Sequence, residues 1–364
     1  MWSEDDLKFM REALSLAKSA EGKTTPDPIV GAVLVKDGSI ISMGYHGEVK
    51  TPHAEAWAIE KAGKKVKGST LYTNLEPCSH YGNNPPCVDM ILTSGIKEVV
   101  AAMKDPNPLV NGKGFRKLKK YGVKVRVGLL KQEAERLNEV FVKYATTKKP
   151  FVVLKSAMTL DGKIAARTGA SRWVASNEAR KFAHHLRNVY DAIVVGVGTV
   201  LIDNPKLTTR MVAKIKNPIR IVLDAFARTP LKADVLSKGA RTIIVVGPKA
   251  KQGKLTALKK RGAEILKVPA PKGKIDLKAL LRKLGRMKIT SLLVEGGGEV
   301  NASFFESGLV NKAHFIIAPK IFGGREAKTP VEGKGLNLPA QAKYLKDVAI
   351  EQLGSDILIT GYLP

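Results

Sequence analysis

The stretch Glu76-Pro77-Cys78-Ser79-His80-Tyr81-Gly82-Asn83-Asn84-Pro85-Pro86-Cys87 contains both cysteines of the chain, and Pro52-His53-Ala54-Glu55 precedes it. His53, Cys78 and Cys87 offer one nitrogen and two sulfur atoms, which are ligand types that zinc prefers. Three protein ligands, with a fourth position left for water, are typical of catalytic rather than structural zinc sites. The sequence therefore predicts one catalytic Zn²⁺ per chain, bound by these three side chains.

Glu55 follows His53 by two residues, and His-x-Glu followed by Pro-Cys and a second Cys is the pattern of zinc nucleobase deaminases. Zinc lowers the pKa of its bound water to about 7, so that hydroxide can attack a carbon that carries an amino group. We expect Glu55 to carry the proton from water to the ring nitrogen and the leaving ammonia. Residues two apart do not share a helix face, so His53 and Glu55 can share one target only beyond the helix N-terminus that Pro52 marks.

Two further histidines, His46 and His80, lie near the same loops. Each of them either binds substrate or only hydrogen-bonds its loop, and the sequence does not decide between these roles. A lone His or Cys is most often structural, but the ordered combination of motifs favours the metal site. Cys78 is expected to precede a helical segment, whose N–H dipoles would favour a thiolate.

Length and composition place the chain among globular proteins. Its 364 residues suffice for two or three domains, and 44% are hydrophobic. No run of about 18 apolar residues predicts a membrane span, and the acidic start, Met1–Asp6, lacks the apolar region of a secretory signal. Two cysteines cannot build a disulfide framework. We therefore expect a cytoplasmic protein without a membrane partner.

The net charge of +28 invites a nucleic-acid interpretation. The lysines recur in nearly every segment, however, and their clusters are short. We therefore expect no nucleic-acid partner and interpret most lysines as solvated surface. Small phosphorylated substrates would be a further reason for positively charged clefts.

The hydrophobic patterns predict two α/β domains, 1–147 and 148–364, joined near Thr146–Pro150. The first has the order αββαβαβαβα, begins with a helix at 4–20 that Ser3 caps together with Asp6, and ends with one helix at about 131–145. The second is expected to contain a mixed sheet and a helix from Ser176 to about Val189. Its strands are expected at 151–155, 191–195, 219–223, 242–246, 291–294, 312–318, 347–352 and 357–360, with two helix–strand alternations after 246.

The spacing Pro-Cys-x8-Cys is longer than the Pro-Cys-x2-Cys of other zinc deaminases, and Cys78–Cys87 is similar to the deaminase half of the bifunctional deaminase–reductases of riboflavin biosynthesis. Short strings of the second domain resemble the reductase half of that family in the same order. These strings are Lys155–Ala165, Ser171–Trp173, His185–Arg187, Val195–Pro205, Leu207–Arg210 and Val294–Gly298. The resemblance implies a cytidine-deaminase-like α/β/α sandwich followed by a dihydrofolate-reductase-like α/β domain.

The same resemblance implies NADPH as the hydride donor and assigns site residues in the second domain. The implied substrate contacts are Lys155, Ser171, Arg187, Leu207, Arg210 and Glu295. The implied NADPH contacts are Ala157, Trp173, Thr199, Asp203 and the segment Gly297, Gly298, Glu299, Val300, Asn301, Ala302 and Ser303. Apart from the resemblance, a strand that ends in Glu295-Gly296-Gly297-Gly298 before a helix suits a pyrophosphate, whereas a Trp is more often core than cofactor contact.

The activity that the resemblance implies has two steps. The first domain deaminates 2,5-diamino-6-ribosylamino-4(3H)-pyrimidinone 5′-phosphate, and the second reduces the ribosyl group to give 5-amino-6-ribitylamino-uracil 5′-phosphate. Lys155, Asp161 or Glu295 could assist proton transfer in the reduction, and the sequence does not choose among them. We expect a homo-oligomer, either a dimer or a tetramer.

Two positions depart from the family pattern. Asp27 stands in Pro26-Asp27-Pro28 where the family usually has Pro-Asn-Pro, and Asn83 replaces a usually basic residue. An ionised Asp27 cannot donate a hydrogen bond and brings negative charge toward a phosphorylated substrate. One alternative is therefore a chain in which only the reductase serves this pathway, while the first domain is inactive or acts on a different amine. A second, independent alternative is an RNA-binding module derived from a base-editing deaminase, which the dispersed charge and the long cysteine spacer disfavour.

Overall fold

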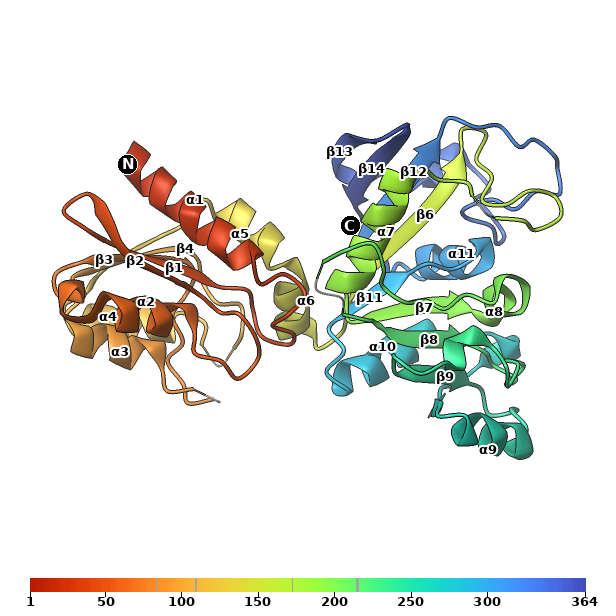
Figure 1. The fold of residues 1–364 in the computed structure, drawn as a ribbon, viewed down its shortest axis with the longest axis horizontal. Coiled ribbons are helices and arrows are strands. Elements are labelled where there is room, and N and C mark those ends of the chain that lie inside the picture. Colours follow the sequence, from red (N-terminus) through yellow and green to blue (C-terminus); the bar gives the residue numbers. More distant parts are fainter. Residues whose placement is uncertain (83, 109, 172, 214–215) are drawn as a thin grey trace. The chain divides into compact units, whose positions relative to one another are not determined.

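The computed structural model describes residues 1–364 except 83, 109, 172, 214 and 215, so that Asn83 lies outside the described residues. The chain divides into two compact units, Met1–Lys148 and Lys149–Pro364 (Figure 1). Within the described part, no helix has the length and hydropathy needed to cross a membrane.

The first unit is built on a five-stranded sheet with the order β2-β1-β3-β4-β5. Strand β1 pairs antiparallel with both of its neighbours, and β3, β4 and β5 run parallel. In Figure 1, α1 and α5 cover one face of this sheet, and α2, α3 and α4 cover the other, which is the expected α/β/α sandwich. The strands are β1 (Gly31–Lys36), β2 (Ser39–Tyr45), β3 (Thr70–Leu75), β4 (Glu98–Met103) and β5 (Lys124–Val127), and the helices are α1 (Glu4–Lys18), α2 (Ala54–Ala62), α3 (Cys87–Ser94), α4 (Lys113–Lys120), α5 (Lys131–Leu137) and α6 (Glu139–Thr147).

Helix α1 begins as the sequence predicts. The hydroxyl of Ser3 accepts a hydrogen bond from the backbone N–H of Asp6, and the Asp6 carboxylate accepts one from the N–H of Ser3. This reciprocal capping box satisfies two N–H groups that would otherwise lack partners.

The prediction of a single helix at 131–145 is wrong, because this segment forms two helices, α5 and α6, that are separated at Asn138. The side-chain amide of Asn138 is buried and bonds both the N–H and the C=O of Ile29, each at 3.0 Å. This contact spans 109 residues of sequence, and it satisfies backbone groups just before β1.

The second unit contains a nine-stranded sheet with the order β10-β9-β8-β7-β11-β6-β12-β14-β13. The strands from β10 to β12 are parallel, and the final β12-β14-β13 pairings are antiparallel, so the expected mixed sheet is present. The strands are β6 (Phe151–Thr159), β7 (Ala192–Gly196), β8 (Ile219–Leu223), β9 (Thr242–Val246), β10 (Glu264–Lys267), β11 (Ser291–Val294), β12 (Lys312–Ala318), β13 (Lys346–Leu353) and β14 (Asp356–Tyr362). The helices are α7 (Asn177–Val189), α8 (Val197–Asp203), α9 (Gln252–Lys260), α10 (Leu277–Arg286) and α11 (Gly298–Glu306).

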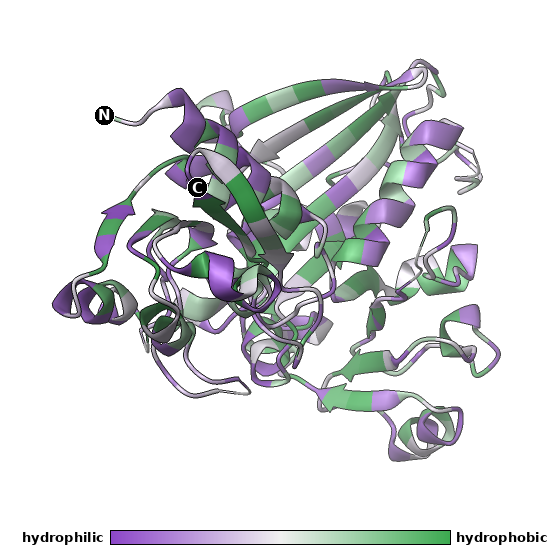
Figure 2. Ribbon diagram, turned by 60° about the vertical axis from the view of Figure 1, so that its left-hand side comes forward, coloured by the Kyte–Doolittle hydropathy of each residue, from purple (hydrophilic) through white to green (hydrophobic). Residues whose placement is uncertain are grey.

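The core of this unit contains fully buried strand residues such as Ile221, Ile243 and Leu292, packed with Leu280 of α10. Figure 2 shows hydrophobic residues gathered along the strands, whereas the helices carry both hydrophobic and hydrophilic bands. Two expectations need correction: β6 extends to Thr159 rather than 155, and the short helix α8 was not predicted. The extension matters because it carries Ala157 toward the carboxyl edge of the sheet.

Candidate active sites

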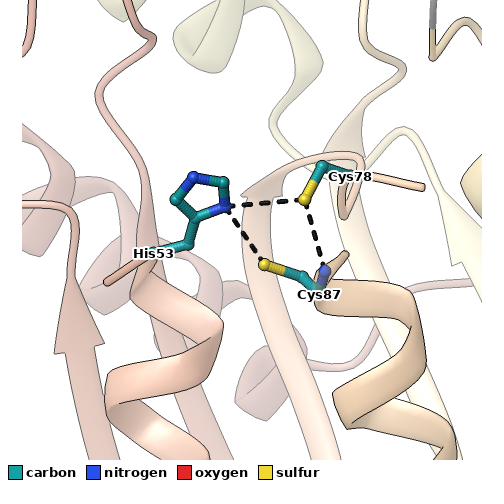
Figure 3. A group of neighbouring side chains, drawn as sticks. All are labelled: His53, Cys78 and Cys87. Carbon is teal, nitrogen blue, oxygen red and sulfur yellow. Dashed lines mark hydrogen bonds between the residues drawn. The ribbon is translucent and has the colours of Figure 1, made fainter. Parts of the chain in front are cut away.

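The three predicted metal ligands meet at the N-termini of two helices (Figure 3). His53 is the N-cap of α2, Cys87 is the first residue of α3, and Cys78 lies in the loop after β3. The Nδ1 atom of His53 lies 3.2 Å from Sγ of Cys87 and 3.5 Å from Sγ of Cys78. Tetrahedral zinc with ordinary bond lengths would separate a nitrogen and a sulfur ligand by about 3.5 Å. The cluster therefore fits zinc, with Nδ1 as the histidine donor.

The two thiols differ in their electrostatics. The hydrogen bond from Cys87 and the contact with His53 lower the pKa of Cys78 to about 4, against the effect of burial. The prediction that Cys78 directly precedes a helix is wrong. Its Sγ instead accepts a hydrogen bond from the backbone N–H of Cys87, the first residue of α3, at 3.3 Å. The pKa of Cys87 is raised, by its hydrogen bond to Cys78 and by burial. One thiolate is thus already favoured without a metal.

Glu55 lies in the first turn of α2 and is buried. Burial raises the pKa of its carboxyl group, whose Oε2 lies 3.5 Å from Sγ of Cys87. A carboxyl group beside the ligand cluster with a raised pKa is suited to receive and return a proton.

A cavity of about 320 Å³ opens beside this cluster and is lined by Asp27, His46 and His80 as well as by His53 and Glu55. The ring of His46 lies edge-on to that of His53, with 5.3 Å between centroids. Its Nδ1 is 3.3 Å from the carbonyl oxygen of Pro52, and its Nε2 is 3.8 Å from the Asp27 carboxylate. The geometry is therefore compatible with both roles considered for His46, because its ring contacts the loop at Pro52 and also lines the cavity where substrate would bind.

In the second unit, a cavity of about 330 Å³ is lined by Lys155, Ala157, Ser171, Trp173, Arg187, Arg210 and Glu295, among others. Arg187 of α7 donates two hydrogen bonds to Glu295 at 2.8 and 2.9 Å, and Nζ of Lys155 lies 3.5 Å from the same carboxylate. Burial opposes ionisation of Glu295, but the charges of Arg187 and Lys155 outweigh it and lower its pKa to about 2. Glu295 is therefore a buried carboxylate that stays ionised.

The predicted cofactor residues are arranged along the carboxyl edge of the sheet. Thr199 and Asp203 belong to α8, and the Ser171 hydroxyl donates to the Asp203 carboxylate at 3.3 Å. Gly297 is the N-cap of α11, so that the segment 297–303 forms the first turns of that helix. Trp173 is 64% exposed and stacks on Arg180, which makes the core interpretation of this tryptophan wrong.

The side chains of three predicted site residues are buried and have less direct access to a bound ligand. Leu207 is buried with φ +49°, at the turn that leads to Arg210. Asn301 and Ala302 are buried on the inner side of α11, where Asn301 donates to the carbonyl of Pro330 at 2.8 Å. Their side chains support the helix, whereas Glu299, Val300 and Ser303 line a second hollow.

Comparison with known proteins agrees with both sites. Residues 150–359 match the RibD C-terminal domain family, and residues 3–103 match the cytidine and deoxycytidylate deaminase zinc-binding region. The chain is 45% identical over 356 residues to riboflavin biosynthesis protein RibD of Actinobacillus pleuropneumoniae, covering 97% of this chain and 94% of that protein. It is 44% identical over 359 residues to the RibD of Aquifex aeolicus (strain VF5), covering 99% of each.

The chain belongs to the RibD family. It is a bifunctional deaminase–reductase of riboflavin biosynthesis, as the sequence resemblance implied. Among solved structures, the diaminohydroxyphosphoribosylaminopyrimidine deaminase/5-amino-6-(5-phosphoribosylamino)uracil reductase of Thermotoga maritima superposes with a TM-score of 0.86 at 38% identity, covering 98% of each chain. The RibD of Acinetobacter baumannii superposes with a TM-score of 0.90 at 33% identity, covering 99% of each. The predicted fold of both domains is confirmed.

Sequence reasoning missed Glu76, which organises one wall of the deaminase cavity. Its buried carboxylate accepts the N–H groups of Asp105, Gly112, Gly114 and Phe115. These bonds hold the loop that brings Asp105 to the cavity. Only the position of Glu76, directly before Pro77 and Cys78, hinted at such a role.

His184 was also missed, although it adjoins the quoted string His185–Arg187. Its Nδ1 accepts the backbone N–H of Arg210 at 3.1 Å. Burial, together with the charges of Arg187 and Arg210, lowers the pKa of His184 to about 4. A neutral His184 therefore holds the Arg210 turn against α7.

Proposed function

We propose that the first unit deaminates 2,5-diamino-6-ribosylamino-4(3H)-pyrimidinone 5′-phosphate and that the second unit then reduces the ribosyl group with NADPH. The observation that carries this proposal is the presence of a chemically complete cluster in each unit. His53, Cys78, Cys87 and Glu55 adjoin one cavity, and Lys155, Arg187 and Glu295 line the other. The Thermotoga maritima relative bears the name of both activities.

In the first unit, His53, Cys78 and Cys87 would hold Zn²⁺, which supplies a water that ionises near neutral pH. The buried Glu55 carboxylate beside this cluster would pass on the two protons of the attacking water in turn, the first to the ring nitrogen and the second to the amino group, which leaves as ammonia. His46 and His80 face the cavity with ring nitrogens that form no hydrogen bond to the described residues, Nε2 in His46 and Nδ1 in His80. These atoms are available to orient the pyrimidine.

In the second unit, NADPH would supply the hydride, and the protein residues position the substrate and provide the proton. Of the three candidate proton donors, Glu295 is held ionised by Arg187 and Lys155. Asp161 accepts hydrogen bonds from Thr159 and from the backbone of Phe322 and Gly323, and it is not among the residues that line the cavity. Lys155 remains, with its ammonium group in the cavity, and we assign it the role of polarising and protonating the opening ribosylamine.

Arg210 accounts for a phosphorylated substrate. The guanidinium of Arg210 is directed by the hydroxyl of Thr208 at 2.8 Å and lies at the cavity that Lys155 also lines. Planar guanidinium groups bind phosphate bidentately. We assign the substrate phosphate to Arg210, because Arg187 is already committed to Glu295.

A second candidate function, a working reductase with a redirected first unit, is favoured by one observation. Asp27 lines the deaminase cavity and lies 3.8 Å from His46, where it adds negative charge beside the pyrimidine site. Supplying the diamino substrate without NADPH tests the first unit, and supplying the deaminated intermediate with NADPH tests the second. Turnover of both supports the two-step proposal; turnover of the second alone supports the alternative. The cytoplasmic location and the homo-oligomer remain predictions.

A further inference from the structure

Helix α7 presents one of its faces to the reductase cavity. Arg180, Ala183, His184 and Arg187 all line the cavity, and they follow one another at the spacings of three and four residues that place side chains on one helix face. The seven positions from Arg180 to Arg187 correspond to about 10 Å along the helix axis. The cavity therefore extends along α7, with a different arginine at each end.

The Arg187 end of the cavity contains the groups to which the proposed reduction already assigns roles. The carboxylate of Glu295 pairs there with Arg187 and Lys155, and the backbone N–H of Arg210 donates to Nδ1 of His184. Burial, and after it the charge of Arg187, lower the pKa of Arg210, so the two guanidinium groups influence one another. The phosphate position that we assign to Arg210 therefore belongs to this end of the cavity.

At the opposite end, Arg180 stacks on Trp173, which also lines the cavity. Its guanidinium lies 4.2 Å from the centroid of the tryptophan ring, so that the cation covers one face of the indole. Nζ of Lys320 donates a hydrogen bond to the backbone carbonyl of Trp173 at 2.8 Å. The backbone N–H of Ser176, the N-cap of α7, donates to the Asp356 carboxylate at 2.7 Å. Both the tryptophan and the first turn of the helix are therefore anchored by other parts of the unit.

The guanidinium of Arg180 has donors that the described residues do not use. Its Nη2 donates to Oδ1 of Asn177 at 2.9 Å, whereas its Nε is buried and has no hydrogen-bond partner among the described residues. Glu295 is the only carboxylate among the described residues that line the cavity, and it pairs with Arg187 and Lys155 instead. A buried donor without a partner is unfavourable, so a bound molecule that offers an acceptor to Arg180 gains affinity.

The deaminated substrate carries acceptors at both of its ends. Its phosphate is at one end, and the carbonyl oxygens of its pyrimidinedione ring are at the other. With the phosphate at Arg210 and the ribosyl group beside Lys155, the ring extends along α7 toward Arg180. A guanidinium group has donors and no acceptor, which suits a carbonyl oxygen.

We infer that Arg180 is a further substrate-binding residue of the reductase, whose guanidinium donates a hydrogen bond to a carbonyl oxygen of the pyrimidine ring while Arg210 binds the phosphate. The inference fixes the orientation of the substrate in the cavity, with the pyrimidine toward the Trp173 end of α7 and the ribosyl group beside Lys155. It rests on the proposed reduction of a phosphorylated pyrimidine by the second unit.

The test is an NADPH-oxidation assay of the full-length protein, with the deaminated intermediate as substrate and ribose 5-phosphate as a competitive inhibitor that lacks the pyrimidine. Arg180→Met is expected to raise the KM for the intermediate about tenfold and to change the Ki of ribose 5-phosphate less than about twofold. Arg180→Lys, which keeps the charge without the planar fork, should recover only part of the affinity. Arg210→Met should raise both constants, because both ligands carry the phosphate. Lys181→Ala removes the exposed cation that follows Arg180 on α7 and should change neither constant.

Two results with Arg180→Met would overturn the inference while leaving the proposed function intact. Equal rises in KM and Ki would mean that Arg180 shapes the whole cavity or binds the phosphate, and unchanged constants would mean that it does not bind substrate. Failure of ribose 5-phosphate to compete in the parent protein would overturn the assigned orientation. A parent protein that oxidises no NADPH with the intermediate would instead contradict the proposed function, and the inference with it. Unchanged circular dichroism and Tm show that each variant has stayed folded.

Discussion

Arg187 and Glu295 form a two-point ion pair, with Nε to Oε1 at 2.8 Å and Nη2 to Oε2 at 2.9 Å. The pair joins α7 to the residue that follows β11, and both side chains are largely buried. Removing one partner of such a pair leaves an uncompensated buried charge. The ion pair therefore both shapes the reductase cavity and makes its stability depend on pH.

Glu295→Gln should reduce the pH dependence of stability at acidic pH. The folded-state pKa is about 2 and the ordinary value is 4.5. A depressed carboxyl pKa contributes stability above the unfolded value, and this contribution, on the order of 3 kcal/mol, is lost as the pH falls from about 5 to about 2. Urea unfolding between pH 7 and pH 3 should show the variant far less stable at pH 7, with the gap narrowing at pH 3. A gap that does not change with pH would contradict this assignment.

Glu55→Gln should retain zinc and lose deamination. The amide preserves shape and burial but cannot take a proton, so we expect ammonia release to fall about 10²- to 10⁴-fold. Metal analysis and an ammonia assay measure the two properties together. Glu60→Gln, an exposed change on the same helix, is the matched control. Loss of zinc together with activity would mean that Glu55 supports the metal rather than the proton transfer.

Cys87→Ala should abolish both zinc binding and ammonia release while leaving reduction of the deaminated intermediate intact. Two ligands remain, which is too few for a stable zinc site. The measurements are the zinc content per chain and NADPH oxidation with that intermediate. If reduction disappears while the circular dichroism spectrum is unchanged, the two units do not work independently.

Asp27→Asn should lower the KM for the phosphorylated diamino substrate about three- to tenfold and change kcat little. The carboxylate lines the cavity and is partly exposed, so removing its charge relieves repulsion of roughly 1 kcal/mol. Asp37→Asn, in the exposed hairpin turn of the same unit, should leave KM unchanged. A rise in KM on removing the Asp27 charge would show instead that the carboxylate binds this substrate.

Asn138→Ala should destabilise the first unit by about 2–4 kcal/mol, because the N–H of Ile29 would be left buried without a partner and the carbonyl of Ile29 would lose one of two amide donors. Denaturant unfolding measures the change. Glu135→Ala removes only an exposed ion pair on α5 and should cost less than about 0.5 kcal/mol. Equal effects of the two substitutions would rule out the proposed anchoring role.

The features that could be predicted from the sequence are those that depend on residues close together along the chain. The capping box of Ser3 and Asp6, the strands and the three metal ligands each follow from residues close together, or from a motif whose chemistry needs those residues. His53, Cys78 and Cys87 converge because each lies at the start of a helix or just after a strand.

Features that depend on distant contacts could not be predicted. Asn138 interrupts a good helical pattern because its amide meets Ile29 across the fold. Glu76 accepts hydrogen bonds from N–H groups that lie 29 to 39 residues later in the sequence, and His184 accepts one from the N–H of Arg210 in another loop. Hydrophobic periodicity indicates which face of a helix or strand is buried, but it does not indicate which distant polar group will hydrogen-bond a side chain on that face.

The most direct test of the account is ammonia release from the diamino substrate by zinc-loaded protein without NADPH, followed by NADPH oxidation when the cofactor is added. We expect ammonia first and then the oxidation of one NADPH per ammonia released. This expectation would be contradicted by an absence of ammonia from a protein that oxidises NADPH only when the deaminated intermediate is supplied, because the cluster of His53, Cys78, Cys87 and Glu55 would then not act on this substrate.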